Sequence, residues 1–418
     1  MSDLLDRDQR HVWHPFTQAA VAAPPLPVVR AEGAWLELAD GRRILDLISS
    51  WWTNLHGHGH PRIADAIARQ ARELDHVLFA GCTHPPAVDV AERLIAMAPG
   101  GLSRVFFSDD GSTAVEVALK MALQFHAQVG QPRRRRFVAF ENAYHGDTVG
   151  AMSMGDRGGF SGAFEPLLFD VQRVPLQLAA LRQLLETQGD EMAAVLLEPM
   201  LQAAGGMLLQ EPALLRGVAD LCRQHGALFI ADEVMTAFGR MGRMFACEHA
   251  DVQPDLLCVA KGLSGGVLPL AATLATESIY DAFLHADPRR AFLHGHSFTA
   301  NPIACAAALA NFAIFDEEPV LERIAAIERF YAARLPLLRR HPLVRDVRWL
   351  GSLGVVELGD ADGYFSASAS HAVRDACLQR GLLLRPLGPV LYTLPPYCIT
   401  TAELSMAYDA MDDVIAGL

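Results

Sequence analysis

The sequence predicts a mainly parallel α/β sheet covered by helices on both faces, joined to a smaller α+β domain. Short apolar runs alternate with helical segments over most of the chain, and longer helical patterns with short strands begin near residue 315. Strands of a buried parallel sheet are continuously apolar, and helical crossovers connect them. We therefore expect a large domain at 55–314 and a small domain formed by 1–54 and 315–418.

The individual elements are expected in the following chain order. An Ala/Pro-rich stretch at 19–27 predicts an extended N-terminal segment that joins the small domain. Strands of the large sheet are expected at six apolar runs: 104–108, 137–140, 193–197, 227–231, 256–260 and 268–275. The clearest helices are expected at 113–129 and 214–225; further helical patterns and short strands follow at 303–315, 320–338, 344–358 and 382–392. In such a sheet, functional groups lie at the carboxyl ends of the strands.

Composition and charge exclude several classes of partner. The net charge of −13 repels nucleic-acid backbones, and the basic run at 133–136 is expected to be a solvated loop. The N-terminus is charged, and no apolar run reaches about 18 residues, so we expect no membrane segment. Seven widely spaced cysteines without a C-x-x-C pair predict buried thiols and a cytoplasmic protein. The mean hydropathy of +0.19 is a hint of an oligomer.

Two of the expected strand ends suit a flat, phosphorylated ligand. In SDDGST at 108–113, Gly111 permits a close backbone approach, and Ser112 offers an N–H and a hydroxyl at a helix N-terminus. In AYHGD at 143–147, Tyr144 lies where a flat ring could stack. Taken alone, each motif has a plainer explanation, a turn with a helix N-cap and a surface aromatic ring respectively.

Two further strand ends carry opposite charges. The run LFIADEV at 228–234 places Asp232 at a buried strand end, where a carboxylate needs a cationic partner such as a protonated pyridine nitrogen. In VAKGLSGG at 259–266, Lys261 enters a glycine-rich turn, where desolvation suits an amine nucleophile. The plainer alternatives are an ion pair or metal ligand and a surface lysine. All four motifs together supply what pyridoxal 5'-phosphate (PLP) needs.

A histidine run invites comparison with metal sites. His56, His58 and His60 alternate with glycine, and no Cys or carboxylate set with zinc-site spacing accompanies them. We therefore expect no metal.

The order of the motifs resembles a known family. GST-A-VE, AYHGDT, LLEP, ADEV-x-x-x-FGR, K-GLSGG and HGHSFTANP follow one another as in the class III aminotransferases of PLP fold type I, over nearly the whole chain. The resemblance implies a large domain with a mainly parallel seven-stranded sheet and a smaller α+β domain. It also implies a homodimer with shared active sites.

The resemblance further implies roles for individual residues. Lys261 would bind PLP as a Schiff base and move a proton during ping-pong transamination, Asp232 would keep the pyridine nitrogen protonated, and Tyr144 would complete the catalytic set. Cofactor contacts are implied for Gly111, Ser112, Tyr144, Asp232, Val234 and Lys261, with His296 and Ser297 arriving from the partner subunit. Implied substrate contacts are Phe16, Trp51, Trp52, Tyr144, Asp147, Arg240, Gly295 and Arg385, the last pairing with a carboxylate.

Additional stretches resemble one branch of this family. HVWHPF at 11–16, SSWWTNLHGHGHP at 49–61 and RPLGPVLYTLPPY at 385–397 are similar to members that convert 8-amino-7-oxononanoate to 7,8-diaminononanoate for biotin. That branch implies S-adenosylmethionine as the amino donor. Many members have tyrosine where this chain has Phe16, and the loop at 295–298 also departs from their pattern, so lysine stays open as donor. Other ω-aminotransferases, a mutase or racemase, and a binding protein without catalysis are the alternatives.

Overall fold

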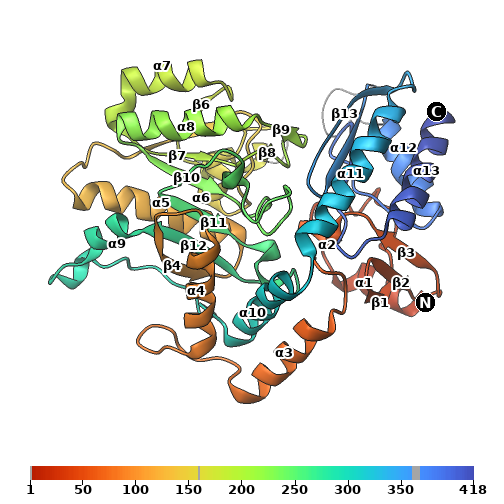
Figure 1. The fold of residues 1–418 in the computed structure, drawn as a ribbon, viewed down its shortest axis with the longest axis horizontal. Coiled ribbons are helices and arrows are strands. Elements are labelled where there is room, and N and C mark those ends of the chain that lie inside the picture. The colour runs from red at the N-terminus through yellow and green to blue at the C-terminus, as the bar shows by residue number, and fades with distance from the viewer. Residues whose placement is uncertain (1, 159–160, 360–367) are drawn as a thin grey trace.

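The computed structural model describes residues 2–158, 161–359 and 368–418 (Figure 1). Its largest sheet has seven strands in the order β4-β12-β11-β10-β7-β5-β6. Their bounds are β4 Leu102–Ser108, β5 Arg136–Phe140, β6 Gln172–Val174, β7 Met192–Leu197, β10 Leu228–Asp232, β11 Leu256–Val259 and β12 Ala271–Thr276. β12 pairs antiparallel with both neighbours, and the other pairs are parallel. The predicted seven-stranded, mainly parallel sheet is therefore confirmed.

Helices cover both faces of this sheet, as the alternation of buried side chains on its strands shows. On β7, Val195 packs in one apolar cluster, and its neighbours Ala194 and Leu196 pack in another on the opposite face. The first face is covered by α4 (Pro85–Met97), α7 (Leu178–Gln188), α8 (Pro212–His225) and α10 (Pro302–Glu317), and the second by α5 (Gly111–Gln128), α6 (Val149–Met154) and α9 (Glu277–Phe283). α3 (Pro61–Glu73) packs along α10.

A second apolar core contains residues of the N-terminal strands and of the C-terminal part of the chain, which Figure 1 shows in red and blue on the same side of the molecule. The four-stranded sheet β1-β2-β3-β15 pairs β3 with β15 in parallel through Leu45 and Leu382, and a three-stranded sheet β13-β14-β16 lies beside it. The strands are β1 Val28–Glu32, β2 Trp35–Leu38, β3 Arg43–Asp46, β13 Val344–Leu350, β14 Leu353–Leu358, β15 Leu382–Leu383 and β16 Val390–Thr393. The helices of this part are α1 Ser2–His11, α11 Val320–Leu338, α12 Ser368–Gln379 and α13 Thr401–Ala416.

Several sequence expectations can be compared with these elements. The six expected strands and four expected helices all occur, and 19–27 is irregular chain ahead of β1. Residues 268–270 are the exception, since β12 begins only at Ala271. Cys82 is exposed, against the expectation of buried thiols. The exact domain limits at 55 and 315 stay a prediction. Within the described ranges, no helix is long and apolar enough to cross a membrane.

Candidate active site

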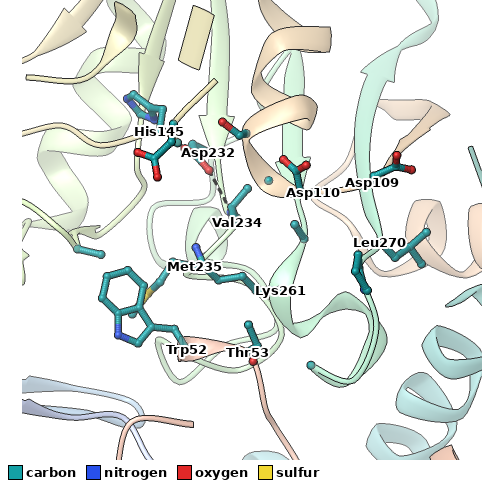
Figure 2. A pocket seen from close by; sticks show the side chains of 18 of the residues that line it. Trp52, Thr53, Asp109, Asp110, His145, Asp232, Val234, Met235, Lys261 and Leu270 are labelled. Atoms are coloured by element: carbon teal, nitrogen blue, oxygen red, sulfur yellow. Dashed lines mark hydrogen bonds and ion pairs between the residues drawn. The ribbon is translucent and has the colours of Figure 1, made fainter. Parts of the chain in front are cut away.

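A pocket of about 710 Å³ opens where five strands of the large sheet end (Figure 2). The segments that follow β4, β5, β7, β10 and β11 each supply lining side chains, among them Asp109, Tyr144, Glu198, Asp232 and Lys261. Carboxyl ends of parallel strands meet at one edge of a sheet, so chain segments far apart in sequence converge there. The pocket therefore lies where the sequence predicted functional groups.

Lys261 reaches this pocket from a strained turn. It begins the 3-10 turn Lys261–Ser264 and has a φ of 43°, a left-handed conformation that non-glycine residues rarely adopt. Its Nζ lies 5.4 Å from the centre of the Trp52 ring. Burial lowers the pKa of the Lys261 amine, and the nearby Asp232 carboxylate opposes that shift. A lysine with a lowered pKa has a larger fraction of nucleophilic free amine.

Asp232 is held in a fixed orientation at the end of β10. Its Oδ2 lies 2.6 Å from Nδ1 of His145, and its Oδ1 accepts a hydrogen bond of 3.1 Å from the Val234 N–H. Both side chains are buried, and Nε2 of His145 has no partner in the described part of the chain. Glu233 faces away from the pocket, where it accepts hydrogen bonds from Ala246 and Cys247. The adjacent carboxylates therefore have separate roles, one in the pocket and one in the core.

Tyr144 is positioned through its own backbone. Its N–H donates to Oε1 of Glu198 over 3.1 Å, while Oε2 of Glu198 accepts from the Ala203 N–H. Burial raises the pKa of Glu198 to about 7. Burial likewise raises the pKa of the Tyr144 phenol, and the carboxylate of Asp147 adds to that shift. The phenol therefore stays protonated and can donate a hydrogen bond.

The start of α5, at Gly111 and Ser112, forms a recess at the pocket that we call the cradle, and its main donors are backbone N–H groups. Asp110 caps the helix, since its Oδ1 accepts from the Thr113 N–H at 2.9 Å, which leaves the first turn's remaining N–H groups at the pocket. A Cβ on Gly111 would lie 2.4 Å from Cγ1 of Val234. Ser112 forms a 2.9 Å hydrogen bond with Thr148. This arrangement suits a phosphate group, with glycine required where the backbone passes Val234.

The aromatic residues predicted for the substrate divide into two groups. Trp52 lines the pocket, and its Nε1 donates to the hydroxyl of Tyr392 over 2.9 Å. Trp51 contacts Phe16 at 5.4 Å between ring centres, and the guanidinium carbon of Arg385 lies 4.0 Å from the Trp51 ring centre. Among the described residues, no carboxylate forms an ion pair with Arg385. Its guanidinium is therefore free to bind an anionic ligand.

Besides Phe16, Trp51 and Arg385, four more predicted site residues do not line the pocket of the same chain. Arg240 is almost fully buried and donates through two nitrogens to the backbone oxygens of Asn54 and Pro395; its contact with a substrate stays a prediction. Gly295 and Ser297 are exposed. His296 lies near the rim, with Nδ1 3.9 Å from Asp109. A role across a subunit interface for the 295–297 loop stays a prediction.

Two buried titratable residues of the pocket, His145 and Glu198, were not predicted as site residues. His145 follows Tyr144 directly, but only the fold places it against Asp232. Glu198 directly follows the apolar strand β7, as Asp232 ends β10, and this similarity of position was the available signal.

The pocket residues fit the chemical groups of PLP. The Lys261 amine suits its aldehyde carbon, the anchored Asp232 carboxylate its pyridine nitrogen, and the cradle that a Cβ at Gly111 would fill its phosphate. In the described residues, no three His, Cys, Asp or Glu side chains gather as a metal ion requires.

The chain was compared with known proteins. The family model "Aminotransferase class-III" matches residues 16–415. The adenosylmethionine-8-amino-7-oxononanoate aminotransferase of Synechococcus elongatus is 49% identical over 97% of this chain and 98% of its own length. The crystal structure of the same-named protein from Methanocaldococcus jannaschii has a TM-score of 0.96 at 36% identity, covering 100% of this chain and 99% of that one. A PLP-bound amine transaminase from an uncultivated Pseudomonas species has a TM-score of 0.91 at 32% identity, covering 97% and 98%.

Proposed function

Because the chain belongs to the class III aminotransferases, which bind PLP, we propose that it transfers an amino group to 8-amino-7-oxononanoate to give 7,8-diaminononanoate for biotin synthesis. S-adenosylmethionine is the proposed donor, in keeping with the names of its full-length relatives. The observation that carries the proposal is the convergence of Lys261, Asp232 and the glycine cradle in one pocket.

The pocket residues have distinct proposed tasks. PLP supplies an electron sink that stabilises negative charge at the carbon losing its proton. Gly111 and Ser112 would hold the phosphate, Asp232 the pyridine nitrogen and Val234 one side of the ring. Nζ of Lys261 would hold the cofactor covalently, and as a free amine it would hold the proton taken from the substrate. Tyr144 and Trp52 enclose the reacting centre and exclude water.

Asp232 can serve this role because two hydrogen bonds fix the orientation of its carboxylate. His145 and the Val234 N–H occupy one lone pair on each carboxylate oxygen. The two remaining lone pairs are available toward the pocket, where a protonated nitrogen is the partner that a buried carboxylate needs. His145 is therefore proposed to support Asp232 through its hydrogen bond to that carboxylate.

A second anchor suits the long acceptor. The guanidinium of Arg385 lies over the Trp51 ring, and a guanidinium held on an aromatic face can pair with a carboxylate through two hydrogen bonds. We propose that Arg385 binds the acceptor's carboxylate and that Phe16, Trp51 and Trp52 contact its aliphatic chain. Asp147, beside Tyr144, is the proposed contact for an amine.

We further propose a homodimer that shares its active sites. Large apolar side chains are exposed around the 295–297 loop, where Leu293 is 82% and Phe298 59% exposed, and Leu78 nearby is 65% exposed. The Phe298 ring contacts His76 at 5.0 Å, so these segments form one apolar surface. Burial of this surface by a second copy would bring His296 and Ser297 to the partner's phosphate site. A cytoplasmic location is also proposed, consistent with seven free cysteines.

The test is a pair of half-reactions on purified protein. Titration with S-adenosylmethionine should bleach the visible band of bound PLP, and 8-amino-7-oxononanoate should restore it with formation of 7,8-diaminononanoate by mass spectrometry. Lysine is titrated separately, because bleaching by lysine alone would change the donor and keep the acceptor. Lys261→Ala is the matched control and should show neither change. A wild-type protein that takes up no PLP would refute the proposal.

A further inference from the structure

The turn that carries Lys261 is held from behind by a buried amide. Asn311 lies in α10 and is fully buried. Its Nδ2 donates to the backbone oxygens of Gly262 and Leu263, 3.0 Å each, which are the two carbonyls directly after the lysine. A left-handed φ at a non-glycine residue is strained and persists only where the surroundings fix it. Asn311 is part of those surroundings.

The orientation of this amide is set by a histidine. Nε2 of His56 lies 2.7 Å from Oδ1 of Asn311. Because that oxygen accepts from the ring, the amide nitrogen is turned toward the two carbonyls, and each of its two hydrogens has one acceptor. A rotation of the amide by 180° would place its nitrogen against the ring N–H and its oxygen against two carbonyl oxygens. The three groups therefore have one consistent arrangement.

His56 keeps this arrangement over the working pH range. Burial lowers the pKa of its ring to about 4, so the ring is neutral near pH 7, and Nε2 carries the proton that Asn311 accepts. His56 also packs edge-on against Phe315 at 5.2 Å, which fixes the ring plane. Neither His56 nor Asn311 lines the pocket. Any effect they have on the reaction must pass through the turn.

We propose that Asn311, oriented by His56, is a positioning residue for Lys261: it fixes the strained turn so that the amine projects into the pocket. This inference rests on the proposed function, in which Lys261 binds PLP. Without the amide, the Leu263 carbonyl loses its donor and the Gly262 carbonyl keeps only the Gly265 N–H at 2.9 Å. The backbone at 261–263 can then relax toward an unstrained φ. Displacement of a reacting group by about 1 Å can cost about 100-fold in rate.

The experiment compares four variants with the wild type. Asn311→Leu removes the amide at similar volume, His56→Leu removes the group that orients it, and His56→Gln retains a donor near the position of Nε2. His126→Leu is the control, because His126 is equally buried and bonds a backbone oxygen, that of Ala193, at the far end of α5. For each protein, the rate of PLP uptake by the apoprotein, kcat, KM and the apoprotein Tm are measured.

The proposal predicts a specific pattern. Asn311→Leu should slow PLP uptake and lower kcat by about 10- to 100-fold, with KM within about threefold of wild type, since the substrate contacts are untouched. The uptake rate and kcat of His56→Leu should lie between those of wild type and Asn311→Leu. His56→Gln should recover most of what His56→Leu loses. His126→Leu should lower Tm and leave uptake and kcat within about twofold of wild type.

Other outcomes would overturn it. A folded Asn311→Leu that takes up PLP and turns over like His126→Leu refutes the positioning role. If Asn311→Leu does not fold, the two His56 variants decide, and equal uptake rates for them refute it. Failure of the wild-type protein to take up PLP would instead refute the proposed function, so the two failures are distinguishable.

Discussion

Gly111 offers the sharpest test of the phosphate cradle, because its environment excludes a single methyl group. The backbone there is compatible with alanine, since Gly111 is the first residue of α5 and its φ is not left-handed. Space is what forbids it: the new Cβ would lie 2.4 Å from Cγ1 and 3.0 Å from Cγ2 of Val234. Carbon atoms in contact normally lie about 3.5–4.0 Å apart, so the helix start or Val234 must move by about 1 Å.

The magnitude follows from this overlap. Overpacking of this kind costs about 1–3 kcal/mol, and if the strain is expressed as a displaced cradle, PLP binding weakens by about 5- to 150-fold. Binding is measured by titrating apoprotein with PLP and following the visible absorbance. Thermal unfolding of the apoprotein serves as the check on folding.

Val234→Ala provides the matched control, because it removes both clashing methyls. The double variant Gly111→Ala/Val234→Ala should bind PLP within about threefold of Val234→Ala alone, since close neighbours couple and distant ones do not. A double variant that binds no better than Gly111→Ala, or an unchanged Kd in Gly111→Ala itself, would show that Val234 does not set the cradle.

Three further predictions concern other groups. His145→Phe retains a ring but removes a charge-assisted hydrogen bond to Asp232 worth about 1.5–3 kcal/mol, so kcat should fall at least about tenfold; an unchanged kcat and an unchanged absorbance titration would contradict it. Arg385→Ala should raise KM for 8-amino-7-oxononanoate about tenfold or more and spare a ketone acceptor without a carboxylate, whereas equal losses would argue against carboxylate binding. Folding lowers the pKa of His56 from 6.5 to about 4, so as pH falls the unfolded chain takes up this proton before the folded one. The free energy of unfolding of wild type, measured in urea, should therefore fall relative to that of His56→Gln between about pH 6.5 and pH 4. A difference that stays constant with pH would contradict this.

The sequence predicted the large sheet and its reactive edge because both depend on local signals. Lys261 and Asp232 each follow an apolar strand, and strand ends of a parallel sheet must meet. β6 was not expected, because its three residues are only partly buried. The N-terminal strands were also missed, because β3 is completed by β15, more than three hundred positions away. Pairing at such a distance leaves no local pattern.

Within the site, the missing information was mostly about partners. The sequence does not show that His145 contacts Asp232 or that Glu198 contacts Tyr144, because the residues of each pair follow different strands. Arg240 was predicted as a substrate contact, and the fold adds two hydrogen bonds to backbone oxygens that the sequence could not show. Asn311 left one signal, a polar residue within the apolar, alanine-rich helix α10. A lone polar residue in such a helix predicts a buried partner without saying which.

The antiparallel strand β12 has a consequence for how this enzyme tolerates change in length. Most strands of the sheet are joined through helices, and such connections lie on the surface, where added residues can bulge outward. The segment 260–270 instead turns β11 directly back into β12, and both of its ends are tied into the sheet. This short connection cannot accommodate an inserted residue by bulging outward, so an insertion would displace Lys261. Natural or engineered length variation should therefore concentrate in the other connections, and this hairpin should keep a constant length.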